Sequence, residues 1–284
     1  MKNFYILCKK YIWGMLPDKL FVRLAFYKCH HKILFLNHPK TFSEKIQWIK
    51  IYGHIDKYAK YVDKYDVRSY INDKIGEKYL MPLLGVWNDF NEIDFSKLPD
   101  QFVLQATHGS GYVYVCKDKT KIDTSVLRNT FNKWLSTNFY NVNREIQYKY
   151  CEPKIICTKY LSDGNGDLKD YKFFSFHGQP KIIQVDSERY VDHKRDLMSL
   201  NWEKLPVKLL YENSEIIQPK PKNFDEMQQI ATKLSADFNF VRVDLYSVNN
   251  KVYFGELTFT PGDGMENFDP QRYDNELGKL LDLK

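Results

Sequence analysis

The chain has 284 residues, of which 43% are apolar and 16% aromatic, so it is too apolar to be disordered and long enough for one large domain or two lobes. Its net charge of +6 is uneven, because residues 1–50 hold ten basic and two acidic side chains while the remainder holds 32 and 34. This pattern excludes a uniformly basic nucleic-acid-binding protein. Five irregularly spaced cysteines without a CxxC pair argue against a disulfide framework or a zinc site and fit a reducing cytoplasm.

Helical spacing of apolar residues predicts four helices in the first quarter of the chain: over residues 4–16, from Pro17, from Thr41 and over 61–75. Thr41 and Glu44 have the spacing of a capping box. No apolar run approaches the ~20 residues of a membrane span, and the run from Phe4 to Cys8 is too short for a signal peptide. We therefore expect a cytoplasmic protein.

Short runs of β-branched and aromatic residues follow after Leu80 and predict strands at 80–87, 102–107, 112–116, 154–161, 171–176, 181–185, 240–247 and 251–259. Further helices are expected over about 123–137, over 224–237 and from about 270. Several of the strands form hairpins, and strands and helices are mixed. This organisation predicts the α+β class rather than a doubly wound parallel sheet.

Two carboxylates, Asp244 and Glu256, lie on the last two predicted strands, which are otherwise apolar. A two-residue turn between these strands would place Asp244 opposite Gly255 and point Glu256 to the other face. A loop of odd length places Asp244 opposite Glu256 and Arg242 opposite Thr258, and only this register separates polar from apolar side chains. We therefore predict a loop of three or five residues, with a residue such as Asn250 at positive φ.

Opposed carboxylates repel each other unless a cation lies between them, and oxygen ligands on rigid strands suit Mg²⁺. Arg242 beside them would hold a phosphoryl oxygen or an oxyanion. The alternative interpretation is a solvated face with cross-strand charge pairs.

Weaker signals lie elsewhere in the sequence. Residues 105–111 (QATHGSG) form a glycine-rich hairpin that can donate backbone N–H groups to phosphates, or is simply a turn. Asp170 and Lys172 share one face of a predicted strand, and Lys64 begins a predicted helix; both sets are also compatible with surface charge. A loop-like stretch carries basic side chains that either receive an anionic substrate or are solvated: Arg189, His193, Lys194 and Arg195.

The order of these pieces resembles the ATP-grasp superfamily, and most closely the TupA-like ATP-grasp family of teichuronopeptide and capsule biosynthesis. Seven motifs carry the resemblance, which covers about residues 37–275: HPKTFSEKIQWIKIYG (38–53), DKYDVRSYI (63–71), IGEKYLMPLLGVW (75–87), LPDQFVLQATHGSG (98–111), EPKIICTKYL (152–161), DYKFFSFHGQPK (170–181) and FVRVDLYSVNNKVYFGELTFTPGDG (240–264). The implied fold is an ATP-grasp fold, in which two α+β lobes clamp ATP.

The resemblance implies roles for the matched residues. The residues implied to bind ATP are Lys64, Gln105, His108, Gly109, Ser110, Gly111, Thr158, Lys159, Tyr160, Leu161 and Asp170. Arg242 and Lys172 are implied at the transferred phosphate, and Arg189 and Arg195 are added as candidate catalytic or substrate-binding residues. The implied Mg²⁺ ligands are Asp244, Glu256 and Thr258. The sequence departs from the family where Gln105 replaces a usual lysine, Thr158 a glutamate and Thr258 an asparagine.

The resemblance also implies a reaction that uses ATP and Mg²⁺, with two Mg²⁺ ions expected. ATP converts a carboxylate to an acyl-phosphate, and an amine then displaces the phosphate to form an amide. The expected partners are an amino acid or amine and a uronic-acid carboxylate, carried by a polysaccharide or by a nucleotide-sugar or lipid-linked acceptor. Alternatives are a kinase of a sugar or polyol, a weakly catalytic nucleotide-binding subunit of a polysaccharide assembly system, or a glycosyltransferase component of such a system. No nucleic acid is expected as a partner.

We expect four segments: a basic helical arm over 1–60, a segment over 61–100 that precedes the ATP-grasp lobes, a small lobe with the glycine-rich loop over 101–160, and a large lobe with the metal site over 161–284. Residues 1–36 lie outside the motifs. They either meet an anionic polymer or the inner face of the membrane, or pack as a helical cap with their lysines in water.

Overall fold

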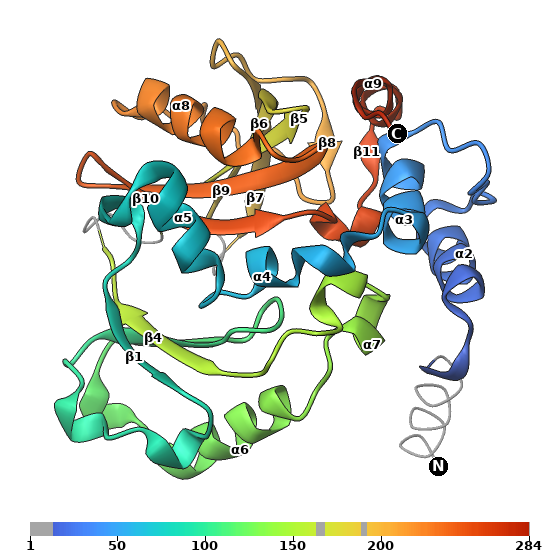
Figure 1. Ribbon diagram of the computed structural model, residues 1–284. Coiled ribbons are helices and arrows are strands. Elements are labelled where there is room, and N and C mark those ends of the chain that lie inside the picture. Colours follow the sequence, from blue (N-terminus) through green and yellow to red (C-terminus); the bar gives the residue numbers. More distant parts are fainter. Residues whose placement is uncertain (1–13, 163–167, 189–191, 284) are drawn as a thin grey trace.

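The computed structural model describes residues 14–162, 168–188 and 192–283, and two antiparallel β-sheets form its two halves (Figure 1). Helices and strands are mixed along the chain, which confirms the predicted α+β class. Nearly all of the predicted helix over 4–16, and the candidate residue Arg189, lie outside the described ranges.

The larger sheet has five strands in the order β10-β9-β5-β6-β7. Their bounds are β5 Asp170–Phe176, β6 Gln179–Ser187, β7 Lys194–Ser199, β9 Phe240–Val248 and β10 Lys251–Thr258. Helix α8 (Phe224–Ser235) covers one face, where Leu234 and Met227 pack with Phe173 and Val243 in the main core (Figure 1). On the opposite face, Phe174, Phe176 and Phe240 pack with Phe42 in a second core. Polar side chains occupy the rest of that face, because alternate residues of a strand point to opposite sides.

The smaller sheet has the order β1-β4-β2-β3, with bounds β1 Leu83–Trp87, β2 Phe102–Ala106, β3 Val113–Cys116 and β4 Ile155–Lys159. Helix α6 (Thr124–Leu135) packs against it through Leu127 and Phe131, which meet Phe102 and Leu104 in a separate core. Asp123 caps this helix by accepting hydrogen bonds from two backbone N–H groups of its first turn. Strand β1 comes from the segment expected to precede the small lobe, and it pairs with β4.

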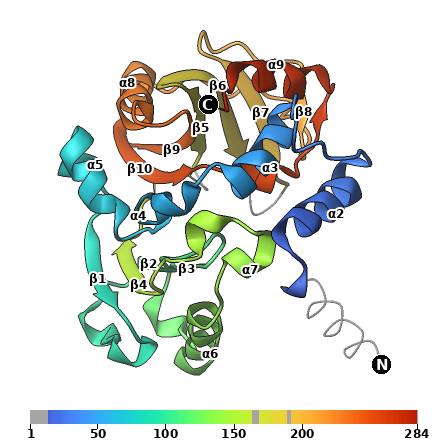
Figure 2. The ribbon, with the colours of Figure 1, turned by 45° about the vertical axis from the view of Figure 1, so that its right-hand side comes forward.

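The N-terminal helices are α2 (Asp18–His30), α3 (Phe42–Tyr52), α4 (Ala59–Val62) and α5 (Val67–Ile75). The capping box of Thr41 and Glu44 is confirmed at the start of α3, which packs against the last helix, α9 (Arg272–Leu280) (Figure 2). The prediction of one helix over 61–75 is wrong. The chain is extended at Asp63, whose carboxylate accepts hydrogen bonds from the backbone N–H groups of Tyr65 and Asp66 and so ends one helix before the next begins.

Shorter elements complete the chain: helix α7 (Tyr140–Asn143), strands β8 (Lys208–Leu209) and β11 (Phe268–Asp269), and single 3₁₀ turns such as Ile146–Tyr148 and Pro261–Gly264. None of the helices within the described ranges is both long and apolar enough to cross a membrane.

The hairpin of β9 and β10 turns through two residues, Asn249 and Asn250, which both have positive φ (52° and 61°). The predicted loop of three or five residues is therefore wrong, although the positive φ of Asn250 is confirmed. Two asparagines in this conformation form the tight turn that matches the twist of the flanking strands.

The pairing of the carboxylates is nevertheless confirmed, because the register shifts by one residue at Gly255. Beyond this β-bulge, Glu256 lies opposite Asp244 and Thr258 lies opposite Arg242. The bulge therefore supplies the odd residue that the longer loop was expected to supply.

Gly255→Ala should lower the free energy of unfolding by about 1–3 kcal/mol, because an added Cβ would lie 3.0 Å from the carbonyl oxygen of Asp244 and 3.0 Å from the ring of Tyr246. Urea denaturation measures this change. Gly14→Ala is the control, since an added Cβ there meets nothing within 4 Å. Equal stability of the two variants would show that the bulge does not need a glycine.

Candidate active site

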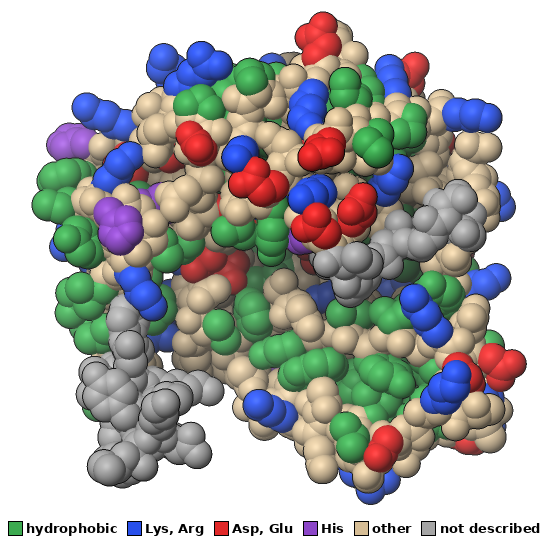
Figure 3. Space-filling model, turned by 180° about the vertical axis from the view of Figure 1, so that it is seen from behind, with side chains coloured by type: hydrophobic (Ala, Val, Ile, Leu, Met, Phe, Trp, Pro, Cys, Tyr) green, Lys and Arg blue, Asp and Glu red, His purple; other side chains and the backbone are tan. Residues whose placement is uncertain are grey.

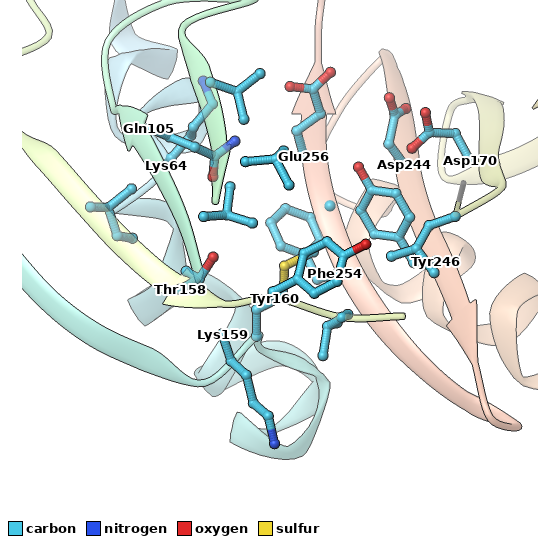
Figure 4. Close-up of a pocket in the computed structure, with 18 of the residues that line it drawn as sticks. Lys64, Gln105, Thr158, Lys159, Tyr160, Asp170, Asp244, Tyr246, Phe254 and Glu256 are labelled. Atoms are coloured by element: carbon cyan, nitrogen blue, oxygen red, sulfur yellow. The ribbon is translucent and has the colours of Figure 1, made fainter. Parts of the chain in front are cut away.

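A cavity of about 590 Å³ lies between the two sheets. Figure 4 shows Lys64 and Gln105 on one wall and Glu256, Asp244 and Asp170 on the other. Of the residues predicted to bind ATP or metal, those that line the cavity are Lys64, Gln105, Ser110, Gly111, Thr158, Lys159, Tyr160, Leu161, Asp170, Asp244 and Glu256, and the predicted catalytic Lys172 joins them. Residues far apart in the sequence thus share one cavity.

The charged wall centres on Asp244, which is buried in β9. Arg242 donates to both of its carboxylate oxygens at 2.7 Å, and Lys172 of β5 donates to one of them at 2.8 Å. Lys172 Nζ also lies 3.6 Å from the carboxylate of Asp170. Because Lys172 is opposite Asp244 in the register of β5 and β9, these contacts follow directly from the pairing of the strands.

Burial by itself would raise the pKa of Asp244, but Arg242 and Lys172 hold it below the ordinary value. Burial would likewise lower the pKa of Lys172, and the carboxylates of Asp244 and Asp170 raise it instead. All three charges of this contact are therefore retained at neutral pH.

The predicted metal ligands converge on one guanidinium nitrogen. Nη2 of Arg242 lies 2.7 Å from Asp244 Oδ2, 3.4 Å from Glu256 Oε1 and 3.1 Å from Thr258 Oγ1. The cation that the opposed carboxylates require is thus supplied within the chain. No group of three or more His, Cys, Asp or Glu side chains that could hold a metal ion occurs in the described part of the chain. Two carboxylates and a hydroxyl are nonetheless oxygen ligands of the kind that Mg²⁺ takes, so they fit this ion if the guanidinium withdraws from the carboxylates.

The glycine-rich loop is tied to the segment that precedes it. The side chain of Lys64 donates to the carbonyl oxygen of Gly109, and its backbone N–H donates to the carbonyl oxygen of Thr107. Burial lowers the pKa of Lys64, with Glu256 acting in the opposite direction. His108 does not line the cavity, because its Nε2 contacts the carbonyl oxygens of Trp134 and Thr137 at the end of α6. Gly109 also lies outside the lining and packs against aromatic rings.

The other end of the cavity is less charged. Apolar side chains of β2, β4 and β10 line it, including Val103, Ile156 and Phe254. The hydroxyl of Thr158 is buried there and has no hydrogen-bond partner within the described residues, so it can bond to a ligand. Lys159 is exposed, and Figure 4 shows its side chain directed away from the carboxylates.

Arg195 lies on β7 of the larger sheet, so the interpretation of its segment as a loop is wrong for Lys194 and Arg195. Its guanidinium is buried and pairs with Asp186 at 2.7 Å and with Glu266 at 2.9 Å. Arg195 is absent from the cavity lining, and its charge is compensated by these two carboxylates.

A second buried polar cluster, beside the end of β10, was not predicted from the sequence. Glu145 accepts a hydrogen bond from Thr260, and Gln147 donates to Thr260 at 2.7 Å. Nearby, Lys50 of α3 pairs with Asp263. Burial, followed by the charge of Asp263, raises the pKa of Glu145 to about 7, and burial raises the pKa of Asp263 to about 6. These residues come from three distant segments, and no short motif links them.

A family model described as TupA-like ATPgrasp matches residues 44–282 of the sequence. No curated protein matches it.

Solved structures of ligases resemble the chain at a distance. The D-alanine–D-alanine ligase of Bacillus anthracis has a TM-score of 0.45 and 15% identity, over 78% of this chain and 65% of the ligase. The corresponding enzyme of Helicobacter pylori has a TM-score of 0.46 and 14% identity, over 86% and 68% of the two chains. The ATP-grasp ligase PsnB, complexed with a precursor variant, Mg and ADP, has a TM-score of 0.40 and 10% identity, over 72% and 51%. The chain therefore spans less than two thirds of the Bacillus ligase and about half of PsnB.

Lys172→Met should lower the free energy of unfolding by about 3–5 kcal/mol, because it leaves the buried Asp244 and Asp170 with one cation fewer. Removal of this cation raises the pKa of Asp244, so the loss should be smaller at acidic pH than at pH 7. Denaturation at several pH values measures both effects. Lys97→Met is the control, since the pair of Lys97 with Asp94 is exposed and should contribute nothing measurable. A pH-independent loss would contradict the assignment.

Glu145→Gln should stabilise the protein at pH 8. The pKa of Glu145 is raised in the folded state to about 7, so its ionisation opposes folding and stability falls as pH rises from about 4.5 to about 7. The variant removes this penalty of roughly 3 kcal/mol, and the gain should vanish near pH 4.5. Thermal unfolding across this range tests the sign, with the exposed Glu152→Gln as the control. A variant less stable than the wild type at pH 8 would refute the prediction.

Proposed function

The chain belongs to the TupA-like ATP-grasp family, and from this we propose that it is an ATP- and Mg²⁺-dependent ligase that joins a carboxylate to an amine. The expected ATP-grasp fold class is thereby confirmed. The carboxylate that we propose belongs to a uronic acid of a cell-surface polysaccharide or its precursor, and the amine to an amino acid or a related compound. We place this activity in the cytoplasm.

The observation that carries the proposal is the polarity of the cavity. One end has apolar walls and the buried, unpartnered hydroxyl of Thr158, which suits a flat base that needs only a few hydrogen bonds. The other end gathers Lys64, Lys172, Asp244 and Glu256, which suits a polyphosphate together with its cation. ATP has this same division between base and phosphates.

The proposed reaction, which the family resemblance implies, has two steps. A substrate carboxylate oxygen attacks the γ-phosphorus, the bond from this phosphorus to the β-phosphate bridging oxygen breaks, and ADP leaves with that electron pair. The amine then attacks the acyl carbon, inorganic phosphate leaves, and the nitrogen loses a proton to form the amide. Lys64 and Lys172 neutralise charge on the transferring group, and no side-chain nucleophile is required. Mg²⁺ bound by Asp244, Glu256 and Thr258 would neutralise further charge on the phosphates.

Arg242 has two roles in this proposal. It holds Asp244 in the structure described here, and it would hold a phosphoryl oxygen once its Nη2 leaves the three oxygen ligands. A guanidinium that is already ordered by two hydrogen bonds loses little additional freedom when it changes partner.

ATP with Mg²⁺ should raise the melting temperature, and incubation with panels of uronic acids and amines should release ADP and phosphate and yield an amide detectable by mass spectrometry. Glu256→Gln should reduce the rate of amide formation at least about 100-fold, because it removes a carboxylate from the phosphate end of the cavity. Glu256 is half-buried, so this variant should fold; Glu203→Gln, on the surface, is the matched control.

The outcomes separate the alternatives. A stable phosphorylated product without an amide would favour the kinase, and nucleotide binding without turnover would favour a nucleotide-binding subunit. Absence of any thermal shift with ATP and Mg²⁺, or full activity of Glu256→Gln, would overturn the proposal.

A further inference from the structure

Helix α2 lies at the periphery of the molecule, next to α3 and α7 (Figure 2). Its inner face is buried in a small core with Phe21, Val22 and Phe26, which pack with Leu34 and Leu36 of the following loop. The inner face therefore accounts for the attachment of the helix to the body. The outer face is not needed for this attachment, and its composition requires another explanation.

The outer face is apolar. Leu20, Leu24 and Tyr27 are spaced by four and three residues, so they lie along one side of the helix. Two exposed apolar side chains of the adjacent loop, Ile33 and Phe35, extend this apolar surface. The exposed fractions are 45% for Leu20, 42% for Leu24, 57% for Tyr27, 66% for Ile33 and 62% for Phe35. Figure 3 shows hydrophobic side chains gathered on this flank of the molecule.

Basic side chains border the apolar stripe. At about 100° per residue, Lys19 and Arg23 fall along one edge of the stripe and Lys28 falls along the other. Asp18, the one acidic residue of α2, is paired with Arg144 at 3.1 Å and accepts a hydrogen bond from Tyr140. Its charge is thus compensated within the protein, and the surface formed by residues 18–36 is positive.

We infer that this surface, made by the outer face of α2 and the loop over 31–36, binds an anionic lipid bilayer. Aliphatic and aromatic side chains flanked by lysine and arginine are the composition of helices that lie in the membrane interface, where apolar groups enter the acyl boundary and cations meet the headgroups. Tyr27 suits the same depth, because its ring is apolar and its hydroxyl is polar.

Two other occupants satisfy only part of this composition. An anionic polysaccharide would pair with Arg23 and Lys28, but its hydroxyl-rich surface gains little from Leu20 and Leu24. A second copy of the chain would cover the leucines, but a symmetric contact would bring equal positive charges together. Only an anionic bilayer offers both an apolar layer and negative charge.

The inference is tested with the full chain and vesicles of phosphatidylcholine, with or without phosphatidylglycerol, in a flotation assay. The wild type should bind the vesicles that contain phosphatidylglycerol, and binding should weaken with salt. Arg23→Gln/Lys28→Gln should weaken binding about 25-fold, since each cation near such a surface contributes roughly a factor of five. Leu20→Asn/Leu24→Asn should abolish binding although it leaves the charge unchanged.

Arg128→Gln/Lys133→Gln is the matched control. It removes two positive charges from the exposed face of α6, on the other sheet, and should bind like the wild type. All of these side chains are exposed, so thermal melts should show that the variants fold. A second measurement reports membrane contact independently of stability. Tyr27→Trp and Val126→Trp each add a tryptophan, and brominated lipids should quench the fluorescence of Tyr27→Trp more than that of Val126→Trp.

The inference would be overturned if the wild type did not bind anionic vesicles, or if the α6 control lost as much vesicle binding as Arg23→Gln/Lys28→Gln. It would also be overturned if the protein bound polygalacturonate instead of vesicles and Leu20→Asn/Leu24→Asn kept that binding. A dimer in light scattering that Leu20→Asn/Leu24→Asn dissociates would likewise contradict it. The nucleotide cavity does not include this surface, so ATP binding should be unchanged in every variant.

Discussion

The structure depends on the contact of one buried carboxylate, Asp244, with Arg242 and Lys172. Each of these charges would be costly to bury alone, and each is acceptable because the others lie within hydrogen-bond distance. The contact joins β5 and β9, and Arg242 also links it to β10 through hydrogen bonds to Glu256 and Thr258. The part of this sheet face that borders the cavity is therefore kept polar, while Phe174 and Phe240 on the same face remain in a hydrophobic core.

The same constraint explains why the proposed Mg²⁺ ligands and the arginine cannot be considered separately. The oxygens that fit Mg²⁺ converge on the guanidinium nitrogen, so cation and arginine compete for one position. The exchange is favourable only if the arginine gains a new anionic partner as the ion enters, and a phosphoryl group provides one. Nucleotide and Mg²⁺ would then depend on each other for binding. The contact of Lys64 with Gly109 has the same character, because under the proposed function it would have to be released before Lys64 reached a phosphate.

The basic arm and the cavity perform separate tasks in this account. Positive charge is concentrated in the N-terminal segment, where α2 presents it around an apolar stripe, while the body carries the carboxylates that hold cations. Of the two interpretations left open by the sequence, the helical cap and the docking surface, the structure contains elements of both. The inner face of α2 packs as a cap, and its outer face has the composition of an interfacial helix.

The sequence by itself determined the α+β class, the family and the residues of the charged wall. Strand alternation places Asp170 and Lys172 on one face, and likewise pairs Arg242 with Asp244 and Glu256 with Thr258 on one face of the last two strands. It also determined the pairing of Asp244 with Glu256, since only that register separates polar from apolar side chains. Tertiary structure decided how this pairing is reached, by a bulge at Gly255 rather than a longer loop, because both routes add one residue and the hydrophobic pattern does not distinguish them. Only the tertiary structure shows that Glu145 contacts Thr260 and that Arg195 contacts Glu266. Residues more than 70 positions apart leave no local pattern in a single sequence that would predict their contact.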